Sequence, residues 1–62
     1  MNFYYATMAL SDGRTLHVKH KSDSLSGAQH TLENWYRCYG IEKLSVSLAP
    51  IKGINYEIAS QN

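Results

Sequence analysis

Two segments near the amino terminus show the every-second-residue alternation that is typical of β-strands. Residues 2–10 are rich in aromatic and aliphatic side chains and contain no Gly or Pro, while residues 14–21 alternate apolar side chains with basic or His side chains. Between them, Ser11-Asp12-Gly13 has the composition of a tight turn, because glycine tolerates the positive φ that such turns require. The pattern predicts a β-hairpin.

The length of this turn decides which side chains share a face of the hairpin. With three loop residues, Met8 pairs with Leu16, and the core face consists of Tyr4, Ala6, Met8, Leu16 and Val18. The opposite face then carries Phe3, Tyr5, Thr7, His17 and Lys19. A two-residue turn would instead bring Thr7 and Ala9 onto the core face. We favour the three-residue loop because it buries the larger side chains.

A helical period follows the hairpin. Apolar residues recur at spacings of three and four, which places on one stripe of a helix Leu25, Ala28, Leu32, Trp35 and Tyr39. The other side of the same helix carries His30, Glu33, Asn34 and Arg37. Ser24 has the side chain of an N-cap residue, and Gly40 stands where a left-handed residue commonly ends a helix. The segment between them is therefore predicted to be an amphipathic helix.

The alternation returns after the helix. Between Lys43 and Ala49 serines alternate with Leu44, Val46 and Leu48, and beyond the turn-like residues 50–53 polar residues alternate with Ile54, Tyr56 and Ile58. Two strands joined by a short turn predict a second hairpin. The order β-β-α-β-β predicts a single α+β domain over residues 1–62, in which an antiparallel sheet has the helix packed on one face. The strand order stays open.

Length and charge restrict the functions that fit. A chain of 62 residues buries little surface for its length, and Cys38 is its single cysteine, so no internal disulfide can stabilise it. Self-association therefore stays open as a source of additional burial. The net charge is +1, which is not typical of proteins dedicated to nucleic acids or membrane surfaces. The apolar amino terminus has no basic leader and is too short to span a bilayer, so we expect a cytoplasmic protein without membrane contact.

Patterns that support catalysis or metal binding are weak. Cys38 lies at the carboxyl end of the predicted helix, where the helix dipole disfavours a thiolate, and helical geometry turns His30 away from it. His17 and His20 are an odd number of residues apart, so they point to opposite faces of a strand rather than to one metal ion. No Gly-rich phosphate loop or carboxylate pair is present. We therefore expect a protein that is not an enzyme and has no metal or cofactor.

A sheet covered by one helix leaves its second face to water or to a partner. We expect this face to bind another protein, since aromatic side chains are frequent anchors at interfaces. The residues expected to form the site are Phe3, Tyr5, His17 and Lys19, with Tyr36 at its flank. The alternative partner is a single-stranded nucleic acid, whose bases would stack on the same aromatics. Its backbone would be held by Arg14, Lys19 and Lys21.

The layout resembles that of very small phage-encoded inhibitors of bacterial defence, which include anti-CRISPR proteins that block type I surveillance complexes. The likeness rests on the expected hairpin–helix–hairpin order and on the residues that open the helix, Ser24, Leu25, Ser26, Gly27 and Ala28. It assigns no functional residue. What the resemblance implies is a stoichiometric binder, encoded by a phage or a mobile element, that occupies a surface of a host protein or protein complex.

Overall fold

The computed structural model describes residues 1–60, and its first two strands form the predicted hairpin. β1 spans Asn2–Leu10 and β2 spans Thr15–Ser22. Ala6 pairs with Val18 and Met8 with Leu16, which confirms the register expected from a three-residue loop. Gly13 adopts a φ of 94° and its N–H donates to the carbonyl of Leu10, so the turn depends on a left-handed residue at this position.

The helix α1 spans Leu25–Trp35 and ends earlier than the apolar stripe suggested. Its N-cap is Ser24, whose hydroxyl accepts a hydrogen bond from the Gly27 N–H at 3.0 Å. Beyond the C-cap residue Tyr36, the chain makes one turn of 3₁₀ helix over Arg37–Tyr39, and this turn, rather than α1, is closed by Gly40 in the left-handed conformation. The predicted caps are therefore both present, but they belong to different helices.

The apolar stripe predicted for the helix is correct except at its first residue, since Trp35 and Tyr39 are half-buried and pack against the core. Ala28 and Leu32 are fully buried against the sheet, whereas Leu25 is 45% exposed. The buried tyrosine is Tyr36 rather than Tyr39, which is half-buried. Tyr36 follows Leu32 by four residues, just as Leu32 follows Ala28, so these three side chains share one face of the helix.

The third strand confirms the face assignment made from its alternation. β3 spans Ile41–Ser47 and pairs antiparallel with β1, with Leu44 opposite Met8 and Val46 opposite Ala6. Both side chains pack against the core beneath α1. Leu48 was expected to continue this inward row, but it lies past the end of the strand and is 56% exposed.

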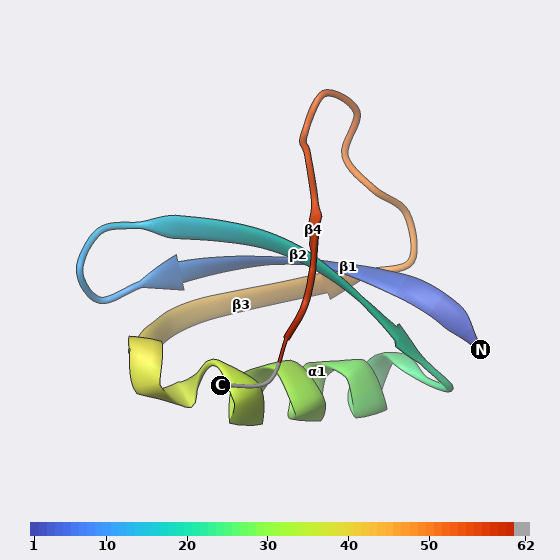
Figure 1. Cartoon of the computed structure of the whole chain (residues 1–62), viewed down its shortest axis with the longest axis horizontal. Coiled ribbons are helices and arrows are strands. Elements are labelled where there is room, and N and C mark those ends of the chain that lie inside the picture. Colours follow the sequence, from blue (N-terminus) through green and yellow to red (C-terminus); the bar gives the residue numbers. More distant parts are fainter. Residues whose placement is uncertain (61–62) are drawn as a thin grey trace.

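The predicted second hairpin is wrong. β4 is only two residues long, Glu57–Ile58, and it pairs in parallel with β2 at the opposite edge from β3. The strand order is β3-β1-β2-β4, so the sheet is mixed rather than antiparallel. Figure 1 shows the connection 48–56 on the side of the sheet away from α1, where it passes over the strands before descending to β4. The alternation of residues 54–58 therefore does not form a long strand, and Ile58 is 63% exposed.

The hydrophobic core lies between α1 and the sheet. Its fully buried members are Ala6, Met8, Leu10, Val18, Leu32, Tyr36 and Ala59. Ala59 follows β4 directly, and its N–H donates to the carbonyl of Lys19, so the carboxyl-terminal segment closes the outer side of this core. One helix packed on a sheet confirms the predicted α+β class.

Candidate functional site

The sheet face away from α1, here called the open face, carries the side chains that alternate outward from the first three strands. β1 contributes Phe3, Tyr5, Thr7 and Ala9, β2 contributes Thr15, His17, Lys19 and Lys21, and β3 contributes Lys43, Ser45 and Ser47. Every charged side chain in this set is a lysine. The open face therefore favours partners that carry negative charge.

The ring of Tyr56 covers the centre of the open face. Its centroid lies 5.1 Å from that of Tyr5 and 5.9 Å from that of His17, both in edge-to-face geometry. The Tyr56 hydroxyl accepts a hydrogen bond from the N–H of Ile51 at 3.1 Å, and Thr7 Oγ1 lies 3.1 Å from His17 Nδ1. Tyr5 and His17 thus lie on the face predicted for them, but the chain itself half-buries them.

A second group of side chains on the open face is here called the Phe3 patch: Phe3, Lys19, Lys21 and Ile58. Phe3 and Lys19 are half-buried, whereas Lys21 and Ile58 are exposed. The Nζ atoms of Lys19 and Lys21 lie 5.5 and 5.3 Å from the centroid of the Phe3 ring. Each such contact is worth about 0.5–1 kcal/mol at an exposed site, which holds the two ammonium groups around the ring. Ile58 pairs with Lys19 in the sheet and therefore points to the same side. An aromatic ring and an exposed isoleucine are thus flanked by two cations.

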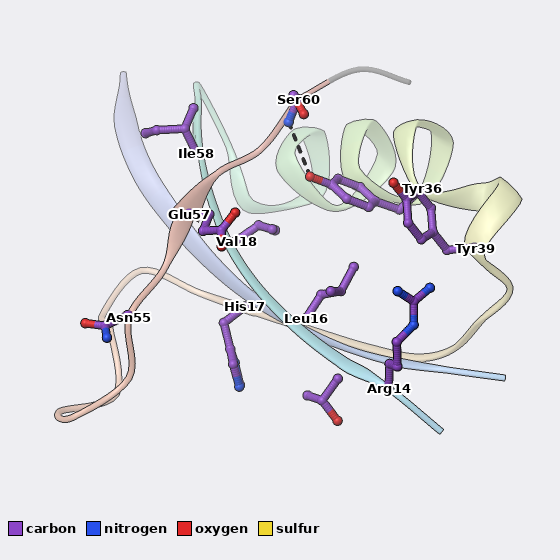
Figure 2. Close-up of a pocket in the computed structure, with 11 residues that line it drawn as sticks. Arg14, Leu16, His17, Val18, Tyr36, Tyr39, Asn55, Glu57, Ile58 and Ser60 are labelled. Carbon is purple, nitrogen blue, oxygen red and sulfur yellow. Dashed lines mark hydrogen bonds between the residues drawn. The ribbon is translucent and has the colours of Figure 1, made fainter. Parts of the chain in front are cut away.

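Tyr36, which was predicted to flank the binding surface, lies on the other side of the sheet. It is 6% exposed, and its hydroxyl accepts a hydrogen bond from the N–H of Ser60 at 3.2 Å (Figure 2). Its position in the core follows from its place on the buried side of α1. Tyr36 therefore does not lie on the open face with Phe3 and Tyr5.

Arg14 does not join Lys19 and Lys21 either. Its Nε lies 2.6 Å from Oδ2 of Asp12, and its guanidinium carbon lies 6.0 Å from the centre of the Tyr39 ring, on the helix side of the sheet. The backbone N–H of Arg14 donates to Asp12 Oδ1 at 2.9 Å, and this bond holds the pKa of the Asp12 carboxyl below its usual range. The basic set predicted for nucleic-acid binding is therefore divided between two sides of the molecule.

A cleft that the sequence did not predict lies along the outer edge of β2, between β4 and the 3₁₀ turn (Figure 2). Its volume is about 450 Å³. Its walls include Leu16 and Val18 from β2, the rings of Tyr36 and Tyr39, and Glu57 at the start of β4. The sequence could not reveal this cleft because it exists only where the carboxyl-terminal segment crosses to the far edge of the sheet.

Within residues 1–60, no three His, Cys, Asp or Glu side chains are grouped closely enough to hold a metal ion. The thiol of Cys38 is free and exposed. No helix among these residues has the length and apolar character needed to cross a bilayer.

Comparisons of the chain with known protein families, with curated proteins and with solved structures give no significant match. The functional argument therefore rests on the two surfaces just described.

Proposed function

We propose that this protein is a non-catalytic protein-binding module that uses the Phe3 patch to occupy a surface of its partner. The observation that carries the proposal is the half-buried Phe3 ring on the open face, flanked by Lys19 and Lys21, with the exposed Ile58 opposite Lys19. An apolar centre with a charged rim is the usual anatomy of a protein interface, and a few aromatic anchors generally supply most of its binding energy.

The charge of the open face defines the partner surface. Because its strand positions carry lysines and no acidic residue, the partner would present an acidic surface around an apolar recess. Such a stoichiometric binder agrees with the resemblance to phage-encoded inhibitors, whose targets are host protein complexes. The proposed role is therefore inhibition by occupying a surface of a host complex.

Single-stranded nucleic acid remains the second candidate because Lys19 and Lys21 flank an aromatic ring on a sheet. Sheets that bind single strands stack successive bases on several accessible aromatic faces. Here Tyr5 lies under Tyr56, and Arg14 is paired with Asp12 on the other side of the sheet. A single half-buried ring between two lysines favours a protein anchor over a nucleic-acid track.

Affinity capture from host extract, followed by titration of the purified partner, tests the proposal. The tagged wild-type protein is compared with Phe3→Ala, Lys21→Glu and the matched control Leu25→Ala, which removes an exposed apolar side chain from α1 instead. We expect the first two variants to weaken partner binding about tenfold or more and Leu25→Ala to leave it unchanged, as loss of an interface anchor costs more than about 1 kcal/mol. Equal binding by wild type and Phe3→Ala would reject the Phe3 patch.

A salt titration separates the two candidates. Labelled single-stranded DNA and RNA are mixed with the protein at low salt, and any binding is followed as salt is raised. For a nucleic-acid binder, the logarithm of the binding constant falls linearly with the logarithm of the salt concentration, because phosphate contacts release counterions. We expect no oligonucleotide binding; a steep salt dependence that Lys21→Glu removes would favour the second candidate.

A further inference from the structure

We propose that the outer edge of β2, from Thr15 to His17, binds an extended peptide of a partner protein as an added β-strand in the cleft of Figure 2. This site is distinct from the Phe3 patch and does not depend on it. The two sites share Ile58, but the Phe3 patch extends over the open face toward Phe3 and Lys21, whereas the cleft extends along the edge of β2 toward Tyr36 and Tyr39.

The backbone direction along β2 supplies the first argument. The carbonyl of Arg14 accepts from the N–H of Leu10, so Arg14 turns its peptide groups toward β1. The carbonyl of Lys19 accepts from the N–H of Ala59, so Lys19 turns its groups toward the outer edge. Since residues of a strand alternate in this respect, Thr15 and His17 face the outer edge as Lys19 does.

This edge is paired over only part of its length. β4 pairs with β2 opposite Val18 and Lys19, and within residues 1–60 no strand lies opposite Thr15, Leu16 and His17 on this side. The cleft is lined by these three residues, and Asn55, in the chain that leads into β4, also lines it (Figure 2). Unpaired N–H and C=O groups in a strand edge are a template for another strand, and main-chain hydrogen bonds supply the affinity in such complexes.

The side walls of the cleft define the chemistry of the peptide. Leu16, Tyr36 and Tyr39 offer an apolar and aromatic surface on the helix side. Figure 2 shows the Glu57 carboxylate beside Val18, and the ion pair found among the described residues joins Arg14 to Asp12, which leaves Glu57 without a cationic partner there. The complementary peptide therefore carries an apolar residue and a Lys or Arg that reaches Glu57.

The other open edge of the sheet is a poorer template. β3 carries Glu42 and Lys43 at successive positions, and charged side chains on an edge strand disfavour the addition of a further strand. Thr15, Leu16 and His17 bring no comparable charge to the edge of β2. A peptide rather than a small ligand is favoured because the unsatisfied groups of the cleft are those of a strand backbone.

Selection from a random nonapeptide library against the intact protein provides the probe, and the best synthetic peptide is titrated into ¹⁵N-labelled protein. We expect selected peptides to contain Lys or Arg next to an apolar residue. At saturation, the amide signals of Thr15 and His17 should move and their hydrogen exchange should slow about tenfold or more, as expected for newly formed ladder bonds. Failure to select any peptide, or shifts confined to the Phe3 patch, would overturn the proposal.

A matched pair of variants isolates the backbone contribution. Thr15→Pro removes an N–H that faces the cleft and not β1, whereas Thr15→Ala removes the same side chain and keeps that N–H. We expect the peptide to bind Thr15→Pro about tenfold more weakly or worse and Thr15→Ala within about twofold of wild type. Equal binding of the peptide by a folded Thr15→Pro and by Thr15→Ala would refute strand addition.

Two further measurements keep the result clear if Thr15→Pro fails to fold. Glu57→Lys should weaken peptide binding through charge repulsion, while Glu57→Gln should have a smaller effect; equal effects would overturn the predicted basic side chain. Sedimentation shows whether copies of the chain associate. A dimer that pairs through this edge would replace the peptide as its occupant. Phe3→Ala should bind the peptide normally, so failure of the Phe3 patch and failure of the cleft give different results.

Discussion

The β1–β2 hairpin and the segment of residues 48–60 carry the same kind of alternation between apolar and polar residues, yet they fold differently. In the hairpin, every second residue of β1 from Tyr4 to Leu10 is buried, and both strands are long. In the carboxyl-terminal segment the strand is two residues long, and Ile51 and Ile58 are exposed. One region is held by a continuous ladder, and the other by a two-residue ladder and a few side-chain contacts.

The difference shows that a turn does not by itself make a hairpin. A turn was predicted at residues 50–53 and forms one residue later, at residues 51–54, with Gly53 at a φ of 91° and the Ile54 N–H bonded to the Ile51 carbonyl. The residues that follow this turn nevertheless do not pair with β3, because Tyr56 packs on Tyr5 and His17 and carries the chain across the open face. Alternation specifies which side chains share a face, but long-range contacts select the strand partner.

The largest expected effect on stability comes from a cavity in the core beneath the β1–β2 hairpin. Met8 is fully buried in β1, so Met8→Ala leaves a cavity and should lower the free energy of unfolding by about 2–5 kcal/mol. Urea denaturation followed by circular dichroism measures this loss. The control Leu48→Ala removes an exposed side chain from the other region and should change stability by less than about 0.5 kcal/mol. Similar losses in both variants would contradict the contrast between the two regions.

A smaller and local effect is expected from releasing the carboxyl-terminal segment. Tyr56→Ala removes two edge-to-face contacts and the hydrogen bond from the Ile51 N–H. An aromatic pair and a hydrogen bond each contribute about 0.5–1.5 kcal/mol, so we expect a loss of about 1–3 kcal/mol in the local stability of residues 48–58. Amide hydrogen exchange should become faster there and stay slow in β1 and β2.

Tyr56→Phe is the matched control, since it keeps the ring and removes only the hydroxyl. Its effect on exchange should be smaller than that of Tyr56→Ala. Equal acceleration of exchange in the hairpin and in residues 48–58 would show that the two regions unfold together, and the comparison would fail.

Local patterns were enough to predict the elements whose partners are neighbours in the sequence. The hairpin register followed from the size of the residues that each register buries, and the start of α1 followed from the capping side chain of Ser24. Tyr36 was misplaced because helical spacing allows both Trp35 and Tyr36 to follow Leu32 toward the core, and the prediction assigned only Trp35 to that side.

In the candidate sites too, the positions set by neighbouring residues could be predicted and those set by long-range contacts could not. Phe3, Lys19 and Lys21 could be placed on one face because the hairpin alone determines their positions. The cover of Tyr56 over Tyr5, the exposure of Ile58 and the cleft beside β2 all depend on the path of residues 48–60. That path is set by contacts between residues distant in the sequence, which no local period encodes.

The smallest expected effect on stability comes from the Asp12 carboxylate in the turn of the β1–β2 hairpin. In the folded protein the N–H of Arg14 lowers the pKa of the Asp12 carboxyl, so the charged carboxylate contributes stability above its ordinary pKa. This contribution is lost as the pH falls through the lowered, folded-state pKa. Both side chains of the pair are largely exposed, so solvent screening keeps the effect small.

Thermal melts of the wild-type protein and of Asp12→Asn across this acidic range test the prediction. Asparagine keeps an oxygen that can accept the Arg14 N–H and removes only the charge, so the stability advantage of the wild type should shrink as the solution is acidified. Exchange in residues 48–58 should respond equally in both proteins, because Asp12 lies in the other region. If the stability advantage of the wild type over Asp12→Asn grew on acidification, the carboxylate would not stabilise the turn. The hairpin register would then be held without it, by the positive φ of Gly13 and its hydrogen bond to Leu10.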